Sequence, residues 1–307
     1  MSATHGMTEY APTDSPYRGR FAPTPSGSLH LGSLFTAVAS YLDARSHNGT
    51  WLIRMDDLDP PRTQAGAAQH IIDCLTAHGL VSDEPIRHQS ACNEGYAQRI
   101  QQLIEQNALF PCTCSRQMLK KHSHYPHTCH HNTLASLPPN TEYAWRIHTR
   151  DADTLTFGDQ LQGCQSHQLL DLGGDFVVQR KDALYAYHLA SVHDDAEQGI
   201  THIVRGNDLL LSTPQHIFLQ RQLNLPQPKY LHLPVLVTPD GHKLSKQFAS
   251  AALQIDTAVD NLKLVLSLLK QPPPPASMTH CHDVLTWGTE HWNPAALMGI
   301  KYITLNA

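Results

Sequence analysis

Two short segments of the chain combine residue types that bind and transfer phosphate. The first runs over residues 20–33 and contains Gly27, His30 and Gly32. We expect it to join a strand to a helix, a junction that presents backbone N–H groups and the positive end of the helix dipole to an anion. Glycine lets a ligand approach the backbone closely, and His30 near the helix start can donate to a phosphate oxygen. The segment predicts a nucleotide site, although a proline-rich turn with a capping histidine is the alternative.

The second segment, over residues 241–246, contains two lysines three positions apart, Lys243 and Lys246. It follows an expected strand and turn. Two ammonium groups on such a loop can neutralise a polyphosphate, most strongly where charge develops on the α-phosphate during displacement. A solvated lysine turn is the alternative when the segment is taken alone.

Three of the seven cysteines, Cys112, Cys114 and Cys129, are clustered in a segment rich in Cys, His and Pro. Three thiolates and one further donor would form a closed tetrahedral zinc site, which would stabilise the fold of its segment and leave no position for water. Buried thiols without a metal are the alternative. From the residues alone a histidine is the expected fourth donor, and the nearby candidates are His122, His124, His127, His130 and His131.

The composition limits the kinds of protein that can carry these segments. The 307 residues are 41% hydrophobic and 16% charged, which suits a globular core and argues against disorder. No run of about 18 apolar residues exists, so no membrane span is expected. The polar residues 1–16 lack a signal core, so we expect a cytoplasmic protein. The formal charge of −5 means that any nucleic-acid partner is held by a local patch.

Hydrophobic spacing predicts the elements that would position these residues. A buried strand over 17–21, a glycine turn, a helix over 29–44 and a strand over 50–55 form a βαβ unit, so we expect a parallel sheet. Further helices are expected at 65–78, 94–106, 213–223 and 259–270, and further strands at 144–148, 175–179, 202–204 and 233–237.

In this order, the two phosphate-type segments resemble the HIGH and KMSKS signatures of class I aminoacyl-tRNA synthetases. The further blocks that are similar to the catalytic domain of glutamyl-tRNA synthetases are residues 20–27, 53–62, 184–195 and 203–206. The resemblance covers residues 17–250 and implies an α/β fold, a Rossmann-like catalytic domain with an inserted acceptor-binding subdomain. It also implies ATP, Mg²⁺ and L-glutamate as ligands. The chain departs from the signatures at Ser33, where the family has His, and at Leu244, where it has Met.

The resemblance implies glutamate and ATP sites only where residues match the family's motifs. Arg20 and Arg205 would hold the side-chain carboxylate of the substrate, since guanidinium forks suit planar carboxylates. Asp56, where the family usually has Glu, would take the α-ammonium. The implied set is Arg20, Phe21, Ala22, Pro23, Thr24, Asp56, Tyr187 and Arg205 for glutamate, His30, Gly32 and Lys246 for ATP, and His30, Lys243 and Lys246 for catalysis. The family often has Asn soon after the tyrosine, whereas His188 follows it here.

The length of the chain indicates which members of this family it resembles. A complete glutamyl-tRNA synthetase carries a helical anticodon-binding region after its second signature, whereas this chain ends at Ala307. The chain therefore resembles the truncated paralogues of that family, which activate glutamate without tRNA and then esterify it onto queuosine, the modified wobble base of tRNA(Asp). Zinc-bearing paralogues imply Tyr125 as the fourth ligand beside the three cysteines, with one structural zinc ion per chain.

The expected organisation is a flexible arm over 1–16, a catalytic domain split into 17–107 and 151–250, an inserted zinc subdomain over 108–150, and a short helical segment over 251–307. We expect a monomer whose partners are ATP, L-glutamate and queuosine-modified tRNA(Asp), with no membrane. Three other hypotheses stay open: a truncated glutamyl-tRNA synthetase that charges a tRNA 3′ end, a non-catalytic tRNA-binding paralogue, and a small-molecule ligase of the same fold.

Overall fold

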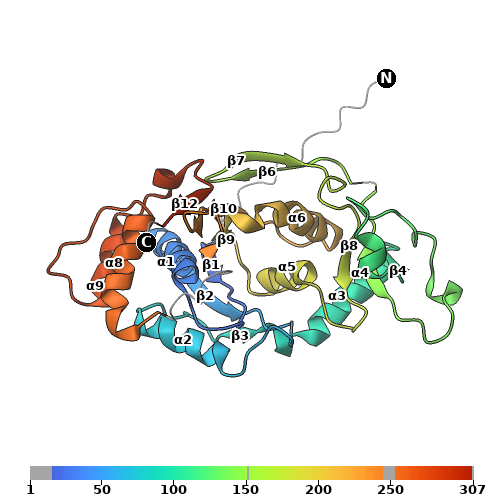
Figure 1. Ribbon diagram of the computed structural model, residues 1–307, viewed down its shortest axis with the longest axis horizontal. Coiled ribbons are helices and arrows are strands. Elements are labelled where there is room, and N and C mark those ends of the chain that lie inside the picture. Colours follow the sequence, from blue (N-terminus) through green and yellow to red (C-terminus); the bar gives the residue numbers. More distant parts are fainter. Residues whose placement is uncertain (1–15, 151, 245–252, 306–307) are drawn as a thin grey trace, which may run out of the picture.

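The computed structural model describes residues 16–150, 152–244 and 253–305. The expected arm lies outside the described residues except for Pro16, and so does Lys246. A parallel sheet occupies the centre, an antiparallel sheet lies on one side of it, and two helices from the end of the chain lie on the other (Figure 1). Within the described ranges, no helix is long and apolar enough to cross a membrane.

The central sheet is built from short parallel strands. These are β1 (Arg18–Phe21), β2 (Thr50–Met55), β3 (Arg87–His88), β9 (His202–Gly206) and β10 (Lys229–Leu233). β1 pairs with β2 and β2 with β3, while β9 pairs with β10, all in parallel. The two groups meet between β1 and β9, where Arg18 O accepts a 3.0 Å hydrogen bond from Thr201 N. The predicted parallel sheet is therefore confirmed.

Helices cover both faces of this sheet. They are α1 (Leu31–Ser46), α2 (Ala67–Ala77), α3 (Asn93–Glu105), α5 (Tyr187–Glu197) and α6 (Thr213–Gln222). Trp51 and Ile53 of β2 are buried in the core that contains α1, whereas Leu52 is buried in the core that contains α3, α5 and α6. Burial on both faces explains why Trp51, Leu52 and Ile53 are apolar in succession rather than alternating with polar residues. α1 connects β1 to β2, as the predicted βαβ unit requires.

A separate antiparallel sheet follows α3. Its strands are β4 (Leu109–Cys112), β5 (Ala144–Ile147) and β8 (Phe176–Gln179), and the short helix α4 (Arg116–Leu119) lies in the long connection between β4 and β5. Between β5 and β8 the chain forms an antiparallel pair, β6 (Leu155–Asp159) with β7 (Gly163–His167). β6 also joins the central sheet, since Asp159 pairs with Tyr230 of β10.

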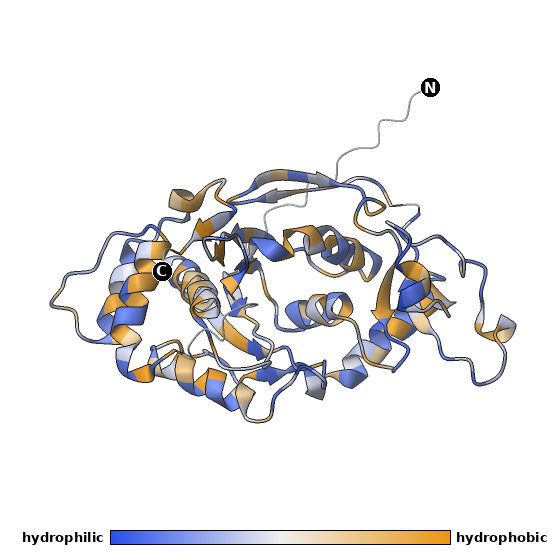
Figure 2. Ribbon diagram, in the orientation of Figure 1, coloured by the Kyte–Doolittle hydropathy of each residue, from blue (hydrophilic) through white to orange (hydrophobic). Residues whose placement is uncertain are grey.

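The end of the described chain returns to the first core. α8 (Ala258–Leu268) and α9 (Cys281–Glu290) pack on α1, and β12 (Tyr302–Thr304) pairs with β11 (Val235–Val237). Both helices carry hydrophobic and hydrophilic turns, as expected of helices with one face against a core (Figure 2). The predicted strand over 233–237 is confirmed in part: β11 covers Val235–Val237, whereas Leu233 is the last residue of β10, which belongs to another sheet. Pro234 stands at the break and has no N–H for a ladder.

Candidate active site

A cavity of about 880 Å³ opens at the carboxyl ends of β1, β2 and β9, beside the start of α1. Ligands of parallel sheets bind at this edge, because strand ends and helix N-termini face the same space. Its walls include the predicted residues Arg20, Phe21, Ala22, Pro23, Thr24, His30, Gly32, Asp56, Tyr187, Arg205 and Lys243. The fold thus brings together residues that lie far apart in the sequence, and Lys246 is outside the described residues.

His30 forms the N-cap of α1 at one wall of the cavity. Its Nδ1 accepts a 3.2 Å hydrogen bond from Ser33 N, so the ring folds over the first turn of the helix. A Cβ on Gly32 would lie 3.2 Å from this ring, which explains the glycine there. Burial, helped by the nearby Lys243 charge, lowers the pKa of His30. His30 is therefore a neutral imidazole at pH 7, beside the positive end of the α1 dipole.

Arg205, at the end of β9, is a buried cation held by neutral partners. Its Nη2 donates to Thr213 Oγ1 at 2.7 Å, its Nε donates to His232 Nε2 at 3.0 Å, and its Nη1 lies 3.4 Å from the hydroxyl of Tyr187. Among the described residues no carboxylate forms an ion pair with it. A buried charge without a counter-ion is costly, so an anionic ligand that enters the cavity gains a strong partner here.

Three histidines around Arg205 stay uncharged. Burial, reinforced by the Arg205 charge, lowers the pKa of His188 to about 4 and holds that of His216 well below its usual range. Burial likewise lowers the pKa of His232 to about 4, although its Nδ1 lies 2.6 Å from Asp159 Oδ2. A neutral His232 that donates through Nδ1 leaves Nε2 free to accept from Arg205. Of these four side chains, only Arg205 therefore carries a positive charge.

Arg20 has a different environment, because it is ion-paired within the protein. Its Nε lies 3.0 Å from Asp195 Oδ1 on α5, and Arg54 Nη1 lies 2.6 Å from the same oxygen. Burial opposes ionisation of Asp195, yet the Arg20 and Arg54 guanidiniums hold its pKa down at about 2. The neighbouring Asp194 accepts from Gln89 Nε2 and Tyr96 OH at 2.8 and 2.7 Å.

Asp56 follows β2 and joins the same network from the cavity side. Its Oδ1 accepts a 2.8 Å hydrogen bond from Arg54 Nε. Burial raises the pKa of Asp56, and the Arg54 charge counteracts that effect. The carboxylate is thus oriented by a buried arginine while its other oxygen remains for a ligand cation.

Lys243 lines the same cavity, and its charge acts on His30. Its Nζ is 2.7 Å from Asp208 Oδ2, and both side chains are partly exposed. An exposed pair of this kind contributes little to stability. The ammonium group can therefore exchange its partner for a phosphate.

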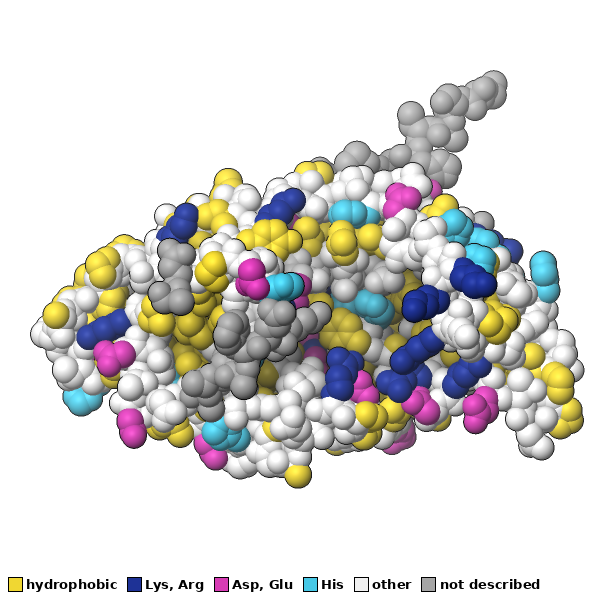
Figure 3. Space-filling view, viewed as in Figure 1, with side chains coloured by type: hydrophobic (Ala, Val, Ile, Leu, Met, Phe, Trp, Pro, Cys, Tyr) yellow, Lys and Arg dark blue, Asp and Glu magenta, His cyan; other side chains and the backbone are white. Residues whose placement is uncertain are grey.

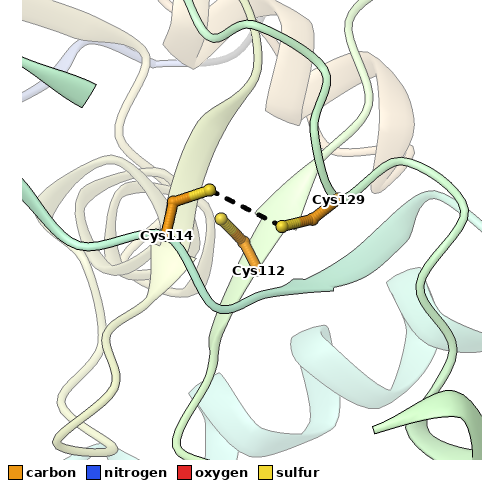
Figure 4. A group of neighbouring side chains, drawn as sticks. All are labelled: Cys112, Cys114 and Cys129. Atoms are coloured by element: carbon orange, nitrogen blue, oxygen red, sulfur yellow. Dashed lines mark hydrogen bonds between the residues drawn. The ribbon is translucent and has the colours of Figure 1, made fainter. Parts of the chain in front are cut away.

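The cysteine cluster, which we define as Cys112, Cys114 and Cys129, lies at the end of β4 and in the connection that follows it (Figure 4). The three Sγ atoms lie within 4.8 Å of one another, and Cys114 and Cys129 are 3.6 Å apart. Tyr125 is buried beside them, with its hydroxyl 3.4 Å from Cys112 Sγ. Burial disfavours the Cys129 thiolate, yet the Tyr125 hydroxyl and a backbone N–H hold its pKa at about 7. The cluster has the chemistry of a metal site.

Sequence reasoning missed several partners of the site. Thr213, His216 and His232 contact Arg205 from α6 and β10, and none of them belongs to a motif. Asp195 stands within one of the motif blocks, but the motif assigns it no role, although it is the partner of Arg20. No pattern in the sequence marks these residues, because their positions depend on how distant elements pack.

Comparison with known proteins agrees with this geometry. The family model of the class I tRNA synthetases for glutamate and glutamine (E and Q), catalytic domain, matches residues 17–266. A glutamate tRNA ligase from Elizabethkingia meningosepticum, whose crystal structure holds its amino acid, is 22% identical with a TM-score of 0.76, covering 95% of this chain and 68% of that chain. The fold and site thus define a class I tRNA synthetase catalytic domain, and the resemblance seen in the sequence is confirmed.

Relatives of similar length identify the family to which the chain belongs within this class. The glutamyl-Q tRNA(Asp) synthetase of Pseudomonas aeruginosa is 46% identical over 281 residues, which is 91% of this chain and 94% of that protein. The protein of the same name from Neisseria meningitidis serogroup C is 43% identical over 284 residues, 90% of this chain and 96% of that protein. The chain belongs to the glutamyl-Q tRNA(Asp) synthetase family.

Proposed function

We propose that the protein activates L-glutamate with ATP, without tRNA, and transfers the glutamate to the queuosine wobble base of tRNA(Asp). The relatives' names support this reaction. The observation that carries the proposal is Arg205, a buried guanidinium without a carboxylate partner among the described residues, in a cavity that also contains the N-terminus of α1. One end of the cavity thus suits a carboxylate and the other suits phosphates.

In the first step the α-carboxylate of glutamate attacks the α-phosphorus of ATP. The bond to the bridging oxygen breaks, pyrophosphate leaves and glutamyl-adenylate forms. His30 donates to the phosphates as a neutral imidazole, and Lys243 and Lys246 stabilise the charge that develops on them. Mg²⁺ bound with ATP supplies further charge neutralisation. No protein nucleophile is needed, so catalysis consists of positioning and electrostatic stabilisation.

The substrate is oriented by charges at its two ends. Arg205 and Tyr187 hold the side-chain carboxylate, and Arg20 adds Nη1, which its pair with Asp195 does not use. The free oxygen of Asp56 takes the α-ammonium. Residues 21–24, which follow Arg20, line the same cavity, and Gly32 lets ATP approach the start of α1.

In the second step a hydroxyl of the queuosine diol attacks the carbonyl carbon of the adenylate. An ester forms, AMP leaves and the hydroxyl proton is released. Lys and Arg side chains gather beside the hollow at the centre of one face (Figure 3). Such a local patch supports tRNA binding in a chain whose formal charge is −5.

We propose that the protein is cytoplasmic, since its tRNA partner is found in the cytoplasm. We also propose that it acts as a monomer.

We also propose that the cysteine cluster holds one structural zinc ion, with Tyr125 as its fourth ligand. Tetrahedral bonds of about 2.3 Å to sulfur and 2.0 Å to oxygen place ligand atoms about 3.5 to 3.8 Å apart. The distances of 3.6 Å between Cys114 and Cys129 and 3.4 Å between Cys112 and Tyr125 fit this arrangement. Two nearby histidines of the expected set, His127 and His130, point their ring nitrogens at Asp175 instead.

The proposed function is tested by incorporation of labelled glutamate, with ATP, into two tRNA(Asp) preparations, one with queuosine and one with guanine at the wobble position. We expect acid-precipitable, alkali-labile label in the queuosine preparation only. Equal label in both would move the ester to the 3′ end and favour a truncated glutamyl-tRNA synthetase. Absence of both label and pyrophosphate exchange would favour a non-catalytic tRNA-binding paralogue. Pyrophosphate exchange without label in either tRNA preparation would indicate a small-molecule ligase.

A further inference from the structure

A second group of metal-ligating side chains lies near the cysteine cluster but is separate from it. We call it the histidine–aspartate cluster: His127 and His130, from the connection after α4, and Asp175, directly before β8. Neither the proposed reaction nor the proposed zinc centre uses these side chains. The Tyr125 ring lies between the two groups, with its centroid 6.2 and 6.0 Å from those of His127 and His130.

Three potential ligand atoms converge in this cluster. Nδ1 of His127 lies 2.9 Å from Nε2 of His130 and 3.4 Å from Oδ2 of Asp175. Nε2 of His130 also contacts that carboxylate oxygen. One proton on His130 Nε2 can serve only one of its two neighbours, and protons on both facing nitrogens would repel each other. A cation between the three atoms removes this conflict.

Asp175 is prepared as a ligand by its own surroundings. It is buried, and its other oxygen, Oδ1, accepts 2.7 and 3.0 Å hydrogen bonds from the backbone N and the Oγ1 of Thr149. Outer hydrogen bonds of this kind fix the orientation of a metal-binding carboxylate. Oδ2 is thereby left facing the two histidines.

The donor set and its exposure indicate the kind of ion. Two imidazoles and one carboxylate suit Zn²⁺ and similar divalent transition metals, whereas Mg²⁺ and Ca²⁺ prefer oxygen ligands alone. His130 is 8% exposed and His127 is 43% exposed, so the cluster is open to solvent on the side of His127. Water can complete the coordination there.

We propose that the histidine–aspartate cluster is a second divalent transition-metal site that binds Zn²⁺ independently of the cysteine cluster. The ion would link the connection after α4 to the antiparallel sheet, because Asp175 precedes β8 and its partner Thr149 follows β5. The role is structural, and it adds an attachment point to a connection that has little regular structure.

The test counts zinc ions per chain in the full-length protein. The protein is loaded with excess Zn²⁺, passed through a gel-filtration column in citrate to remove loosely held ions, and analysed by elemental mass spectrometry. The variants are His127→Asn and Asp175→Asn, and the matched control is His131→Asn, an exposed neighbour outside the cluster. Asn tolerates the positive φ of 59° at residue 127. In a parallel Co²⁺-loaded sample, the thiolate-to-metal charge-transfer band reports on the cysteine cluster alone.

We expect His127→Asn and Asp175→Asn each to bind one ion fewer than the wild type, with the charge-transfer band unchanged, and His131→Asn to match the wild type. Equal zinc in wild type and His127→Asn would overturn the proposal. Loss of the charge-transfer band from His127→Asn would also overturn it, since these histidines would then serve the cysteine cluster. If Asp175→Asn fails to fold, the zinc content of His127→Asn decides the test. The His127 side chain is exposed and is not part of the core, so we expect this variant to fold.

Discussion

Arg20 on β1 and Asp195 on α5 form a buried ion pair, with Nε 3.0 Å from Oδ1 and Nη2 3.4 Å from Oδ2. Arg205, on the neighbouring strand, faces the same cavity without such a partner among the described residues. The two arginines therefore differ in their effect on a ligand. The charge of Arg20 is largely compensated inside the protein, whereas the charge of Arg205 is available to a substrate carboxylate.

Arg205→Gln should lower kcat/KM for glutamate in ATP–pyrophosphate exchange by about thirtyfold or more, because truncating one partner of a buried charged pair costs about 2 to 5 kcal/mol. KM for ATP should change little. Arg221→Gln, an exposed arginine in the last turn of α6, is the control and should leave both constants near the wild-type values. An unchanged dependence on glutamate in Arg205→Gln would contradict the assignment.

Gly32→Ala should separate activity from stability. Ala is favoured over Gly in a helix by about 1 kcal/mol, so the urea midpoint should hold or rise. The new Cβ would lie 3.2 Å from the His30 ring and displace it, so kcat for exchange should fall by about tenfold. Gly158→Ala is the control, since a Cβ there meets nothing within 4 Å. Full activity in Gly32→Ala would mean that the position of His30 is not important.

Asp195→Asn should destabilise the protein at pH 7 by about 3 to 5 kcal/mol, because Arg20 and Arg54 would lose a shared buried counter-ion. The pKa of Asp195 in the fold, about 2, is below its ordinary 3.8. The carboxylate therefore stabilises the fold above pH 3.8, and this contribution is lost as the pH falls toward 2.

Urea unfolding at pH 7 and pH 3 checks this expectation. Acidification should remove less stability from Asp195→Asn than from the wild type, since the variant has no carboxylate to protonate. The exposed Asp182, paired with Arg180, supplies the control Asp182→Asn, which should stay within about 0.5 kcal/mol of the wild type. Equal acid losses in wild type and Asp195→Asn would contradict the argument.

Tyr125→Phe should weaken the proposed zinc centre without removing its thiolates. We expect zinc to pass to a chelator about tenfold faster than from the wild type, and Cys129→Ser should lose this ion altogether. Tyr302→Phe, at an exposed tyrosine, and Cys164→Ser, at an exposed cysteine, are the controls. Unchanged zinc release from Tyr125→Phe would show that another side chain is the fourth ligand.

The spacing of hydrophobic residues was sufficient to predict the central elements. The expected strand at 50–55 matches β2, and the expected helix at 29–44 differs from α1 by two residues at each end. The pair β6 and β7 was not predicted. Buried Leu155, Phe157 and Asp159 alternate with exposed residues along β6 and could have indicated a strand, but β7 is largely exposed and gives no such signal.

Only those residues of the candidate site that belong to sequence motifs could be predicted. Arg20, His30 and Arg205 stand in segments with recognisable neighbours, and the fold places them around one cavity. The preference of His130 for Asp175 over the thiols could not be predicted, because Asp175 is 45 residues further along the chain. A contact of this kind is decided by strand pairing, here between β5 and β8, which local spacing does not encode.

The adjacency of β1 and β9 has a consequence for how the protein is made. Synthesis proceeds from the N-terminus, so β1, α1 and β2 leave the ribosome long before β9 exists. Until residues 195–206 emerge, the edge of β1 opposite β2 has no neighbour, Arg20 lacks Asp195 and the cavity lacks one wall. Pairing across such a separation closes a long loop and slows folding. The cavity is therefore completed late in synthesis, and a nascent chain stopped before β9 lacks the site that we propose for glutamate.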